Sequence, residues 1–247
     1  MTSSTVETLY GRNPIVEALR AGRRRISALK VAQGAQVEGA LAQAIELARK
    51  QEIPVDIVPR QELDQAGINH QGVAADTSPY PYVDLDEILE LCDRSPERSL
   101  ILILDMLQDP QNLGTLLRSA EAVGVAGVII PAHRSASVTP AVVRASAGAT
   151  EHLFIARQNL AQAMRTLKQA QFWIAGLEHG PQAQDYSQAS YAGRMALVVG
   201  NEGSGLRRLV RESCDFLVEI PMRGKIGSLN AAVAGSIVLY AAHAQRI

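Results

Sequence analysis

The chain from Leu100 onward alternates between short apolar runs and longer amphipathic stretches. The first run is uninterrupted, which is typical of a parallel strand covered on both faces. Strands that alternate with helices predict an α/β domain with a mostly parallel sheet. The predicted strands are Leu100–Leu104, Gly127–Ile130, Phe172–Ala175, Leu197–Val199 and Phe216–Ile220, and the predicted helices are Thr115–Val123, Thr139–Ala147, Leu160–Gln171 and an alanine-rich segment after Asn230.

The beginning of the chain shows a second, smaller α/β pattern. Apolar spacing from Val6 to Leu19 predicts a helix that stops at Gly22. No catalytic constellation stands out among the elements that follow, which are strand Ile26–Val31, helix Val37–Lys50, strand Ile53–Val58, helix Gln61–Ala66 and a strand after Asn69.

Pro79 and Pro81 mark a boundary, because prolines one residue apart exclude both a helix and a central strand. An acidic helix, Asp84–Cys92, follows them. We therefore predict a small domain of residues 1–77, a linker of residues 78–98 and the larger α/β domain of residues 99–247.

Composition narrows the class of protein. The 247 residues are 47% hydrophobic, which is ample for packed cores, and Met1–Thr5 lead into no apolar run. We predict a cytoplasmic protein without a membrane span. Cys92 and Cys214 lie far apart without nearby histidine spacing, so neither a disulfide framework nor a metal site is expected.

The formal net charge of −1 hides an uneven distribution. Residues 81–98 hold two basic and six acidic side chains (2 − 6 = −4), whereas residues 99–247 hold 13 basic and 10 acidic ones (13 − 10 = +3). The overall charge is therefore a weak argument against an anionic partner.

Three polar turns, two of them rich in glycine, follow predicted strands. They are Asp109–Gly114, Gly200–Gly205 and Met222–Gly227. In open α/β sheets ligands bind at the carboxyl edge, so these turns predict a binding site. The order of glycines does not match a dinucleotide fingerprint, and neither a phosphate-loop lysine nor a serine-hydrolase elbow is present. Group transfer from a bound cofactor fits best, because it needs backbone to hold the donor and a few polar side chains to place the acceptor.

In order and spacing, three motifs resemble those of SPOUT-class RNA 2′-O-ribose methyltransferases of the TrmH and RlmB type. The front of the chain is similar to the small substrate-binding domain of that family, so the resemblance covers essentially the whole sequence. The motifs are Asn112-x-Gly114-x-x-x-Arg118, Gly200-Asn201-Glu202-Gly203-x-Gly205-Leu206, and Ile220-Pro221-Met222-x-Gly224 followed by Ser228-Leu229-Asn230; the front-domain segments are Tyr10-Gly11-x-Asn13-Pro14-Ile15 and His70-Gln71-Gly72-Val73.

The resemblance implies an α/β fold whose C-terminal segment forms a deep trefoil knot, preceded by a small RNA-binding domain similar to ribosomal proteins. It implies S-adenosylmethionine as cofactor, a homodimer packed partly through the C-terminal helix, and large-subunit (23S) ribosomal RNA as partner, with a guanosine ribose as acceptor. The implied cofactor-binding residues are Gly200, Ile220 and Leu229 through backbone groups, with Leu197, Val199 and Met222 as walls of the adenine pocket.

The same resemblance implies the catalytic set Arg118, Asn112, Glu202, Ser228 and Asn230. A guanidinium is a poor proton acceptor, so we expect Arg118 to clamp an RNA phosphate and orient the hydroxyl rather than to act as the base. Ala231-Ala232 depart from the family pattern, in which a valine and a serine are more usual. In the front domain, the expected phosphate contacts are Arg12, Arg23, Arg24 and Arg25.

Other functions remain open at this point. A tRNA ribose methyltransferase, or a resistance enzyme that modifies another ribosomal nucleotide, would use the same motifs. An RNA-binding assembly factor without turnover would not need the full catalytic set. A nicotinamide-dependent oxidoreductase would bind NAD and not S-adenosylmethionine.

Overall fold

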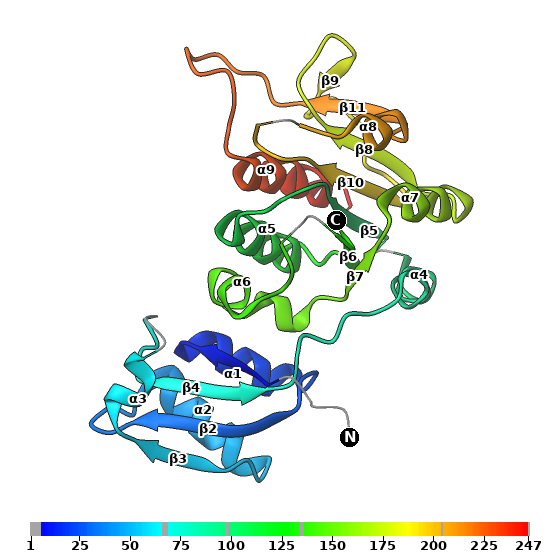
Figure 1. Cartoon of the computed structure of the whole chain (residues 1–247). Coiled ribbons are helices and arrows are strands. Elements are labelled where there is room, and N and C mark those ends of the chain that lie inside the picture. Colours follow the sequence, from blue (N-terminus) through cyan, green and yellow to red (C-terminus); the bar gives the residue numbers. More distant parts are fainter. Residues whose placement is uncertain (1–5, 66–68, 97–98, 134–135, 204, 247) are drawn as a thin grey trace. The chain divides into compact units, whose positions relative to one another are not determined.

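Two separate sheets organise the part of the chain that the computed structural model describes, which is residues 6–65, 69–96, 99–133, 136–203 and 205–246. Contacts divide the chain into two compact units. Unit 1 comprises Met1–Pro81 and Ser137–His152, and unit 2 comprises Tyr82–Ala136 and Leu153–Ile247. Figure 1 labels the elements of both.

Unit 1 is built on a four-stranded mixed sheet in the order β1-β4-β2-β3. Strand β4 pairs antiparallel with β1 and β2, whereas β2 and β3 are parallel. The elements from the front of the chain are β1 (Glu7–Tyr10), α1 (Arg12–Ala21), β2 (Ile26–Ala32), α2 (Gly39–Lys50), β3 (Val55–Val58), α3 (Arg60–Asp64) and β4 (Val73–Thr77).

The prediction of one helix from Val6 to Leu19 is wrong at its beginning. Residues Glu7–Tyr10 form β1 because they pair with β4, and this pairing overrides the helical spacing. Gly11, with φ of +97°, turns the chain from β1 into α1. At the other end Gly22 adopts the left-handed conformation and stops α1 as predicted.

A segment from the second half of the chain completes unit 1. Ser137–His152 contains α6 (Pro140–Ala145) and the 3₁₀ helix η2 (Ala149–His152). The Tyr80 hydroxyl donates a hydrogen bond of 3.0 Å to the Thr150 carbonyl, and Arg24 pairs with buried Glu151. Helix Thr139–Ala147, predicted as part of the larger domain, is thus present but packs with the front of the chain.

Unit 2 is built on a seven-stranded sheet in the order β7-β6-β5-β10-β8-β11-β9, and every pair in it is parallel. This confirms the predicted α/β class. The strands are β5 (Leu100–Leu104), β6 (Gly127–Pro131), β7 (Ile155–Gln158), β8 (Trp173–Leu177), β9 (Ala183–Asp185), β10 (Met195–Val199) and β11 (Phe216–Glu219), and the helices are α4 (Leu85–Arg94), α5 (Pro110–Ala122), α7 (Leu160–Gln169), α8 (Arg208–Glu212) and α9 (Ala231–Ala244).

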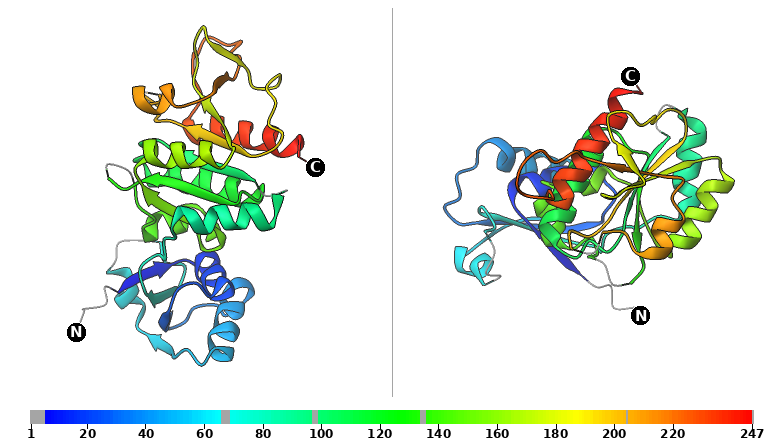
Figure 2. Two further views of the ribbon diagram at one scale, coloured as in Figure 1. Left: turned by 90° about the vertical axis from the view of Figure 1, so that its right-hand side faces the viewer. Right: turned by 90° about the horizontal axis from the view of Figure 1, so that it is seen from above.

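Helices cover both faces of this sheet (Figure 2). Helices α4, α7 and α8 lie on one face, and α5 and α9 lie on the other. Strands β5 and β10 are buried along their whole length, which explains their uninterrupted apolar sequences. The sequence patterns missed β7 and β9, because both are short edge strands of three or four residues that include polar ones.

Close packing fixes α9 against α5 and β10. A Cβ atom on Gly235 would lie 2.9 Å from Leu116 Cδ1 and 3.1 Å from Val199 Cγ2. Beside it, the Ser236 hydroxyl donates a hydrogen bond of 2.8 Å to Ser119 Oγ. The first turns of α9 are therefore held against the middle of α5 and the end of β10.

Candidate active site

Three polar side chains from three separate segments of the chain meet at one point in unit 2. Asn112 Nδ2 donates to Glu202 Oε1 at 3.0 Å, and Asn230 Nδ2 donates to Asn112 Oδ1 at 2.8 Å. Asn230 also donates to Glu202 Oε1, which in addition accepts the backbone N–H of Ala231 at 3.2 Å. We call Asn112, Glu202 and Asn230 the polar triad. The structure thus brings together three of the five predicted catalytic residues.

Helix termini position two members of the triad. Asp109 caps α5 by accepting the N–H groups of Gln111 and Asn112, and Pro110 occupies the first turn, where its missing N–H costs nothing. Asn230 caps α9 by accepting the N–H groups of Ala232 and Val233. The Glu202 carboxylate also lies at the N-terminus of α9, where it accepts the backbone N–H of Ala231.

Glycine allows the loop after β10 to fold tightly. A Cβ atom on Gly200 would lie 2.5 Å from the carbonyl carbon and oxygen of Gly205, a distance that no side chain tolerates. Asn201 and Gly205 exchange backbone hydrogen bonds of 3.2 and 3.0 Å, and Asn201 Nδ2 donates to the Met106 carbonyl. Gly205 itself has a φ of +63°. The two glycines thus leave backbone, rather than side chains, facing the neighbouring space.

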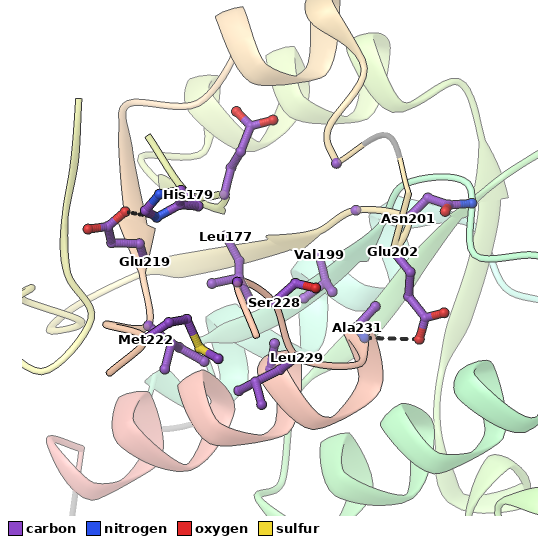
Figure 3. Close-up of a pocket in the computed structure, with 16 residues that line it drawn as sticks. Leu177, His179, Val199, Asn201, Glu202, Glu219, Met222, Ser228, Leu229 and Ala231 are labelled. Carbon is purple, nitrogen blue, oxygen red and sulfur yellow. Dashed lines mark hydrogen bonds and ion pairs between the residues drawn. The ribbon is translucent and has the colours of Figure 1, made fainter. Parts of the chain in front are cut away.

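A pocket lies beside the triad at the carboxyl ends of β8, β10 and β11 (Figure 3). Its walls combine apolar side chains with exposed backbone and a few polar groups. Leu229 and Met222 come from the loop before α9, and Val199 comes from the end of β10. The residues that line it are Leu177, Glu178, His179, Val199, Gly200, Asn201, Glu202, Gly205, Glu219, Ile220, Met222, Gly227, Ser228, Leu229, Ala231 and Ala234.

Most predicted cofactor-binding residues line this pocket. Leu197 does not, because it is fully buried in the middle of β10, whereas the pocket begins at the end of that strand. Its prediction as an adenine wall is corrected accordingly. Ser228, predicted as catalytic, lines the pocket and is exposed.

Arg118 stands apart from the triad in this structure. It lies on α5, six residues after Asn112, and its side chain is exposed. Within the described part of the chain its guanidinium makes no hydrogen bond and no ion pair. It is therefore a cation available to an anionic partner.

The sequence patterns missed the end of β8. Leu177, Glu178 and His179 line the pocket, where His179 Nδ1 lies 2.6 Å from Glu219 Oε2. Glu178 pairs with Arg211 at 2.9 Å and contacts the Gly205 turn. A polar pair directly after the apolar Trp173–Leu177 run, and before Gly180-Pro181, was the available signal.

The three neighbouring arginines predicted to contact RNA differ in how accessible their side chains are. Arg24 is corrected: its side chain is fully buried and pairs with Glu7 and Glu151, so it is not available to phosphate. Arg23 is half-buried, stacks on Tyr80 and donates to Tyr80 Oη and the Pro81 carbonyl. Arg25 is exposed.

Arg12 lines an open cleft in unit 1 together with Arg60, which the sequence patterns did not single out. Arg12 donates to the carbonyls of Gln71 and Gln36 at 3.1 and 3.3 Å, which fixes its guanidinium at the edge of the cleft. Arg60 is exposed and has no hydrogen-bond or ion-pair partner in the described ranges. Gly34 and Gly72 also line this cleft.

The described residues form neither a cluster of metal ligands nor a helix that could cross a membrane. No group of three or more potential metal ligands lies close together among them. Among the same residues, no helix has the length and apolar character that a membrane crossing requires.

A parallel α/β sheet with a glycine-bounded pocket at its carboxyl edge defines a protein that binds a small cofactor there. Residues 99–240 match the SpoU rRNA Methylase family, and residues 8–83 match the family described as RNA 2'-O ribose methyltransferase substrate binding. The chain belongs to the SpoU family of RNA methyltransferases, as the resemblance of its three motifs indicated.

Relatives and solved structures agree with this membership. A putative TrmH family tRNA/rRNA methyltransferase, YacO of Bacillus subtilis, is 40% identical over 240 residues, covering 96% of this chain and 95% of the relative. The SpoU methyltransferase AviRb of Streptomyces viridochromogenes, in complex with AdoMet, has a TM-score of 0.81 at 27% identity, with 98% and 90% covered. An AdoMet-bound rRNA methyltransferase of Sinorhizobium meliloti has a TM-score of 0.76 at 26% identity, with 97% and 87% covered. The chain is therefore an RNA 2′-O-ribose methyltransferase that uses S-adenosylmethionine.

Proposed function

We propose that this enzyme methylates the 2′-hydroxyl of one guanosine ribose in 23S ribosomal RNA, in the cytoplasm. The observation that carries the proposal is the polar triad beside the pocket at the ends of β8, β10 and β11. The front of the chain supports an RNA partner, since it matches a substrate-binding family. Residues 1–77 would bind RNA, residues 78–98 would link the two domains, and residues 99–247 would carry out the methyl transfer.

The pocket suits S-adenosylmethionine, which supplies an electrophilic methyl group when bound. Backbone of Gly200, Ile220 and Leu229 would hold the polar edges of the cofactor, and Val199 and Met222 would pack against its adenine. Ser228 would lie next to the transfer site. Gly200 lets this loop fold tightly, because a Cβ atom there would meet the Gly205 carbonyl, and the folded loop would present its backbone to the cofactor.

The triad would position the ribose. Glu202 accepts hydrogen bonds from both asparagines and from the N-terminus of α9, so its carboxylate is fixed before any substrate arrives. A carboxylate that is already fixed beside the ribose would accept a hydrogen bond from the 2′-hydroxyl and align it for in-line attack without reorganisation of the site. Asn112 and Asn230 hold that carboxylate in place.

Arg118 would clamp an RNA phosphate. Its exposure and its lack of a partner among the described residues leave the planar fork available for two parallel hydrogen bonds. A guanidinium stays protonated at neutral pH and is a poor proton acceptor, so the phosphate it holds, rather than Arg118 itself, would relay the hydroxyl proton to solvent.

In unit 1 the RNA backbone would follow the cleft between Arg12 and Arg60. Arg12 is already oriented by two carbonyls, so little side-chain entropy is lost when it meets a phosphate. Exposed Arg25 would add a peripheral contact, whereas Arg24 would stabilise the unit from inside.

A homodimer and a trefoil knot complete the proposal. Val233 and Tyr240, seven residues apart on α9, are about half exposed and lie on one face of that helix. A second copy packed on this face would cover them. The knot is proposed from the family resemblance, and the insertion of β10 between β5 and β8 is compatible with it.

Transfer of labelled methyl from S-adenosylmethionine to total rRNA and, separately, to total tRNA tests the substrate. We expect label in rRNA, mapping to one 2′-O-methylated guanosine of the large subunit. Label in tRNA alone would overturn the rRNA assignment. This is the main alternative, because relatives such as YacO are named as tRNA/rRNA methyltransferases. Tight cofactor binding without label in either RNA, or in isolated precursor ribosomal particles, would favour an assembly factor without turnover.

A further inference from the structure

The loop from β11 to α9 is exposed along its whole length. Each residue from Pro221 to Asn230 is exposed, and the ribbon stands away from the sheet before it enters α9 (Figure 1). The two ends of this loop line the pocket, through Met222 on one side and Gly227–Leu229 on the other. The middle, Arg223–Ile226, is not part of the pocket wall. We call these four residues the loop tip.

Ile226 has the largest exposed fraction, 74%, of the exposed large hydrophobic residues in the described chain. One exposed apolar side chain is ordinary on a protein surface, so its neighbours decide what it means. Arg223 and Lys225 precede it, and neither has a hydrogen bond or ion pair within the described residues. No acidic residue follows Glu219 in the sequence. The Asp185 carboxylate interacts electrostatically with Arg223. The loop tip thus combines an apolar end with two basic side chains that form no hydrogen bond and no ion pair in the described part of the chain.

Gly224, within the loop tip, and Gly227, directly after it, are glycines that no packing contact requires. A Cβ atom on Gly224 or Gly227 would meet nothing within 4 Å, and neither residue has a positive φ. This contrasts with Gly200 and Gly235, where close contacts require glycine. Glycines that no contact requires leave the backbone conformationally free, so the tip can change shape when a partner binds.

We infer that the loop tip grips RNA beside the target nucleotide and inserts Ile226 between two bases, so that the target ribose is turned toward the triad. The inference rests on the proposed function and deepens it. Enzymes that act on a base inside a duplex turn the nucleotide out of the stack, and apolar side chains wedged between base steps bend the backbone at other nucleic-acid sites. A wedge of this kind beside the target would turn its ribose toward the triad. Arg223 and Lys225 would supply the phosphate contacts that hold the wedge in place.

The test uses the full-length protein and a transcript that spans the nucleotide mapped with the wild type, with 2-aminopurine next to the target. We expect wild-type protein to raise 2-aminopurine fluorescence on binding, and Ile226→Ser to lose that rise. The kcat/KM for this RNA falls about tenfold in Ile226→Ser, since one lost base contact of about 1.4 kcal/mol corresponds to that factor. Ile226→Leu retains both signals.

Leu209→Ser is the matched control, because Leu209 is an exposed apolar residue on α8 of the same unit. It leaves both signals at wild-type level. Arg223→Ser with Lys225→Ser lowers the dependence of RNA affinity on salt concentration. S-adenosylmethionine affinity and sedimentation coefficient stay at wild-type values in every loop-tip variant.

Three results overturn the inference. Wild-type fluorescence and turnover in Ile226→Ser would rule out a wedge. A weaker affinity of Ile226→Ser for S-adenosylmethionine would make the tip a cover of the cofactor, and a shift toward monomer would make it a contact between two copies. Failure of the proposed function is separate, since the wild type would then transfer no methyl to RNA.

Discussion

At the scale of single residues, the account depends on atoms that are held before a substrate binds. Glu202 Oε1 receives three hydrogen bonds, from Asn112, Asn230 and the Ala231 backbone. Each partner is itself fixed, since Asn112 lies in the first turn of α5 and Asn230 caps α9. Such preorganisation lowers the cost of aligning a hydroxyl for transfer.

Arg118→Lys tests the clamp. An ammonium is a point charge and does not present the planar fork of a guanidinium, so kcat is expected to fall about a hundredfold, within the range for loss of one preorganised donor. S-adenosylmethionine affinity, measured by calorimetry, stays unchanged. Nearly full turnover in Arg118→Lys would rule out a two-pronged clamp.

Gly200→Ala tests the backbone packing of the pocket. The added methyl would lie 2.5 Å from the Gly205 carbonyl, so the loop must move, and the dissociation constant for S-adenosylmethionine rises by about tenfold or more. Gly203→Ala, in the same loop, is the control because its Cβ meets only Asn201 Oδ1 at 3.9 Å. Equal affinities in the two variants would contradict the packing argument.

We expect substitution of Arg24 to lower the stability of the protein and substitution of Arg60 to weaken its RNA binding. Arg24→Met strands Glu151 without its partner inside unit 1, so the free energy of unfolding falls by about 3 kcal/mol in denaturant titrations. Arg60→Ser keeps its stability and weakens RNA binding with a smaller salt dependence. A loss of RNA affinity in Arg24→Met at full stability would restore the phosphate role predicted from the sequence.

At the scale of elements, helix α9 connects the site to the fold. It starts at the triad, and Gly235 lets it approach α5 and β10 one turn later. Packing here therefore sets the position of Asn230 relative to Glu202. Small residues in this helix are required by space rather than by helix propensity, since glycine disfavours a helix interior.

Gly235→Leu is expected to lower the midpoint of thermal unfolding by several degrees, because the new side chain would overlap Leu116 and Val199. Methyl transfer falls with it, as Asn230 is displaced. Ala244→Leu, at the exposed end of the same helix, leaves the midpoint in place. An unchanged midpoint in Gly235→Leu would show that α9 is not tightly packed.

Sequence patterns predicted the elements of unit 2 well where burial is uniform. Strands β5 and β10 are central, so their apolar character alone identified Leu100–Leu104 and, within β10, Leu197–Val199. The edge strands β7 and β9 escaped notice because half-exposed strands carry polar residues. In unit 1, the pairing of β1 with β4 overrode helical spacing, and this non-local contact leaves no periodic signal.

The same contrast holds for the site. Motifs located Asn112, Glu202 and Asn230. Their mutual hydrogen bonds could not be predicted, because Asn112 and Glu202 are 90 residues apart in the sequence and Glu202 and Asn230 are 28 residues apart. Leu197 was misplaced because a pattern gives the strand and not the position where the pocket begins. Arg24 was misread because a run of three arginines does not reveal which one turns inward to Glu151.

At the scale of the whole molecule, the Cys92 thiol is buried and the Cys214 thiol is partly buried. Burial raises the pKa of Cys92 from an ordinary value of 9.0 to about 11, and that of Cys214 to about 12. A raised pKa favours the protonated native state. The stability linked to these protons is therefore complete below pH 9 and declines as the pH rises toward 11 and 12.

We expect thiol reagents at pH 8 to label the native protein slowly and the denatured protein at once, since the thiolate is the reactive form. The free energy of unfolding falls between about pH 9 and pH 11, and less so in Cys92→Ala with Cys214→Ala. Rapid labelling of either cysteine in the native state would contradict the burial of that thiol.

The most direct test of the central claim is the chemical identity of the methylated nucleoside. Large-subunit rRNA is incubated with S-adenosylmethionine and either wild-type protein or Glu202→Ala, digested to nucleosides and measured by mass spectrometry. The account predicts 2′-O-methylguanosine with the wild type and a loss of at least about a hundredfold in the variant. A methyl group on a base, or equal product from Glu202→Ala, would contradict a ribose held by the polar triad.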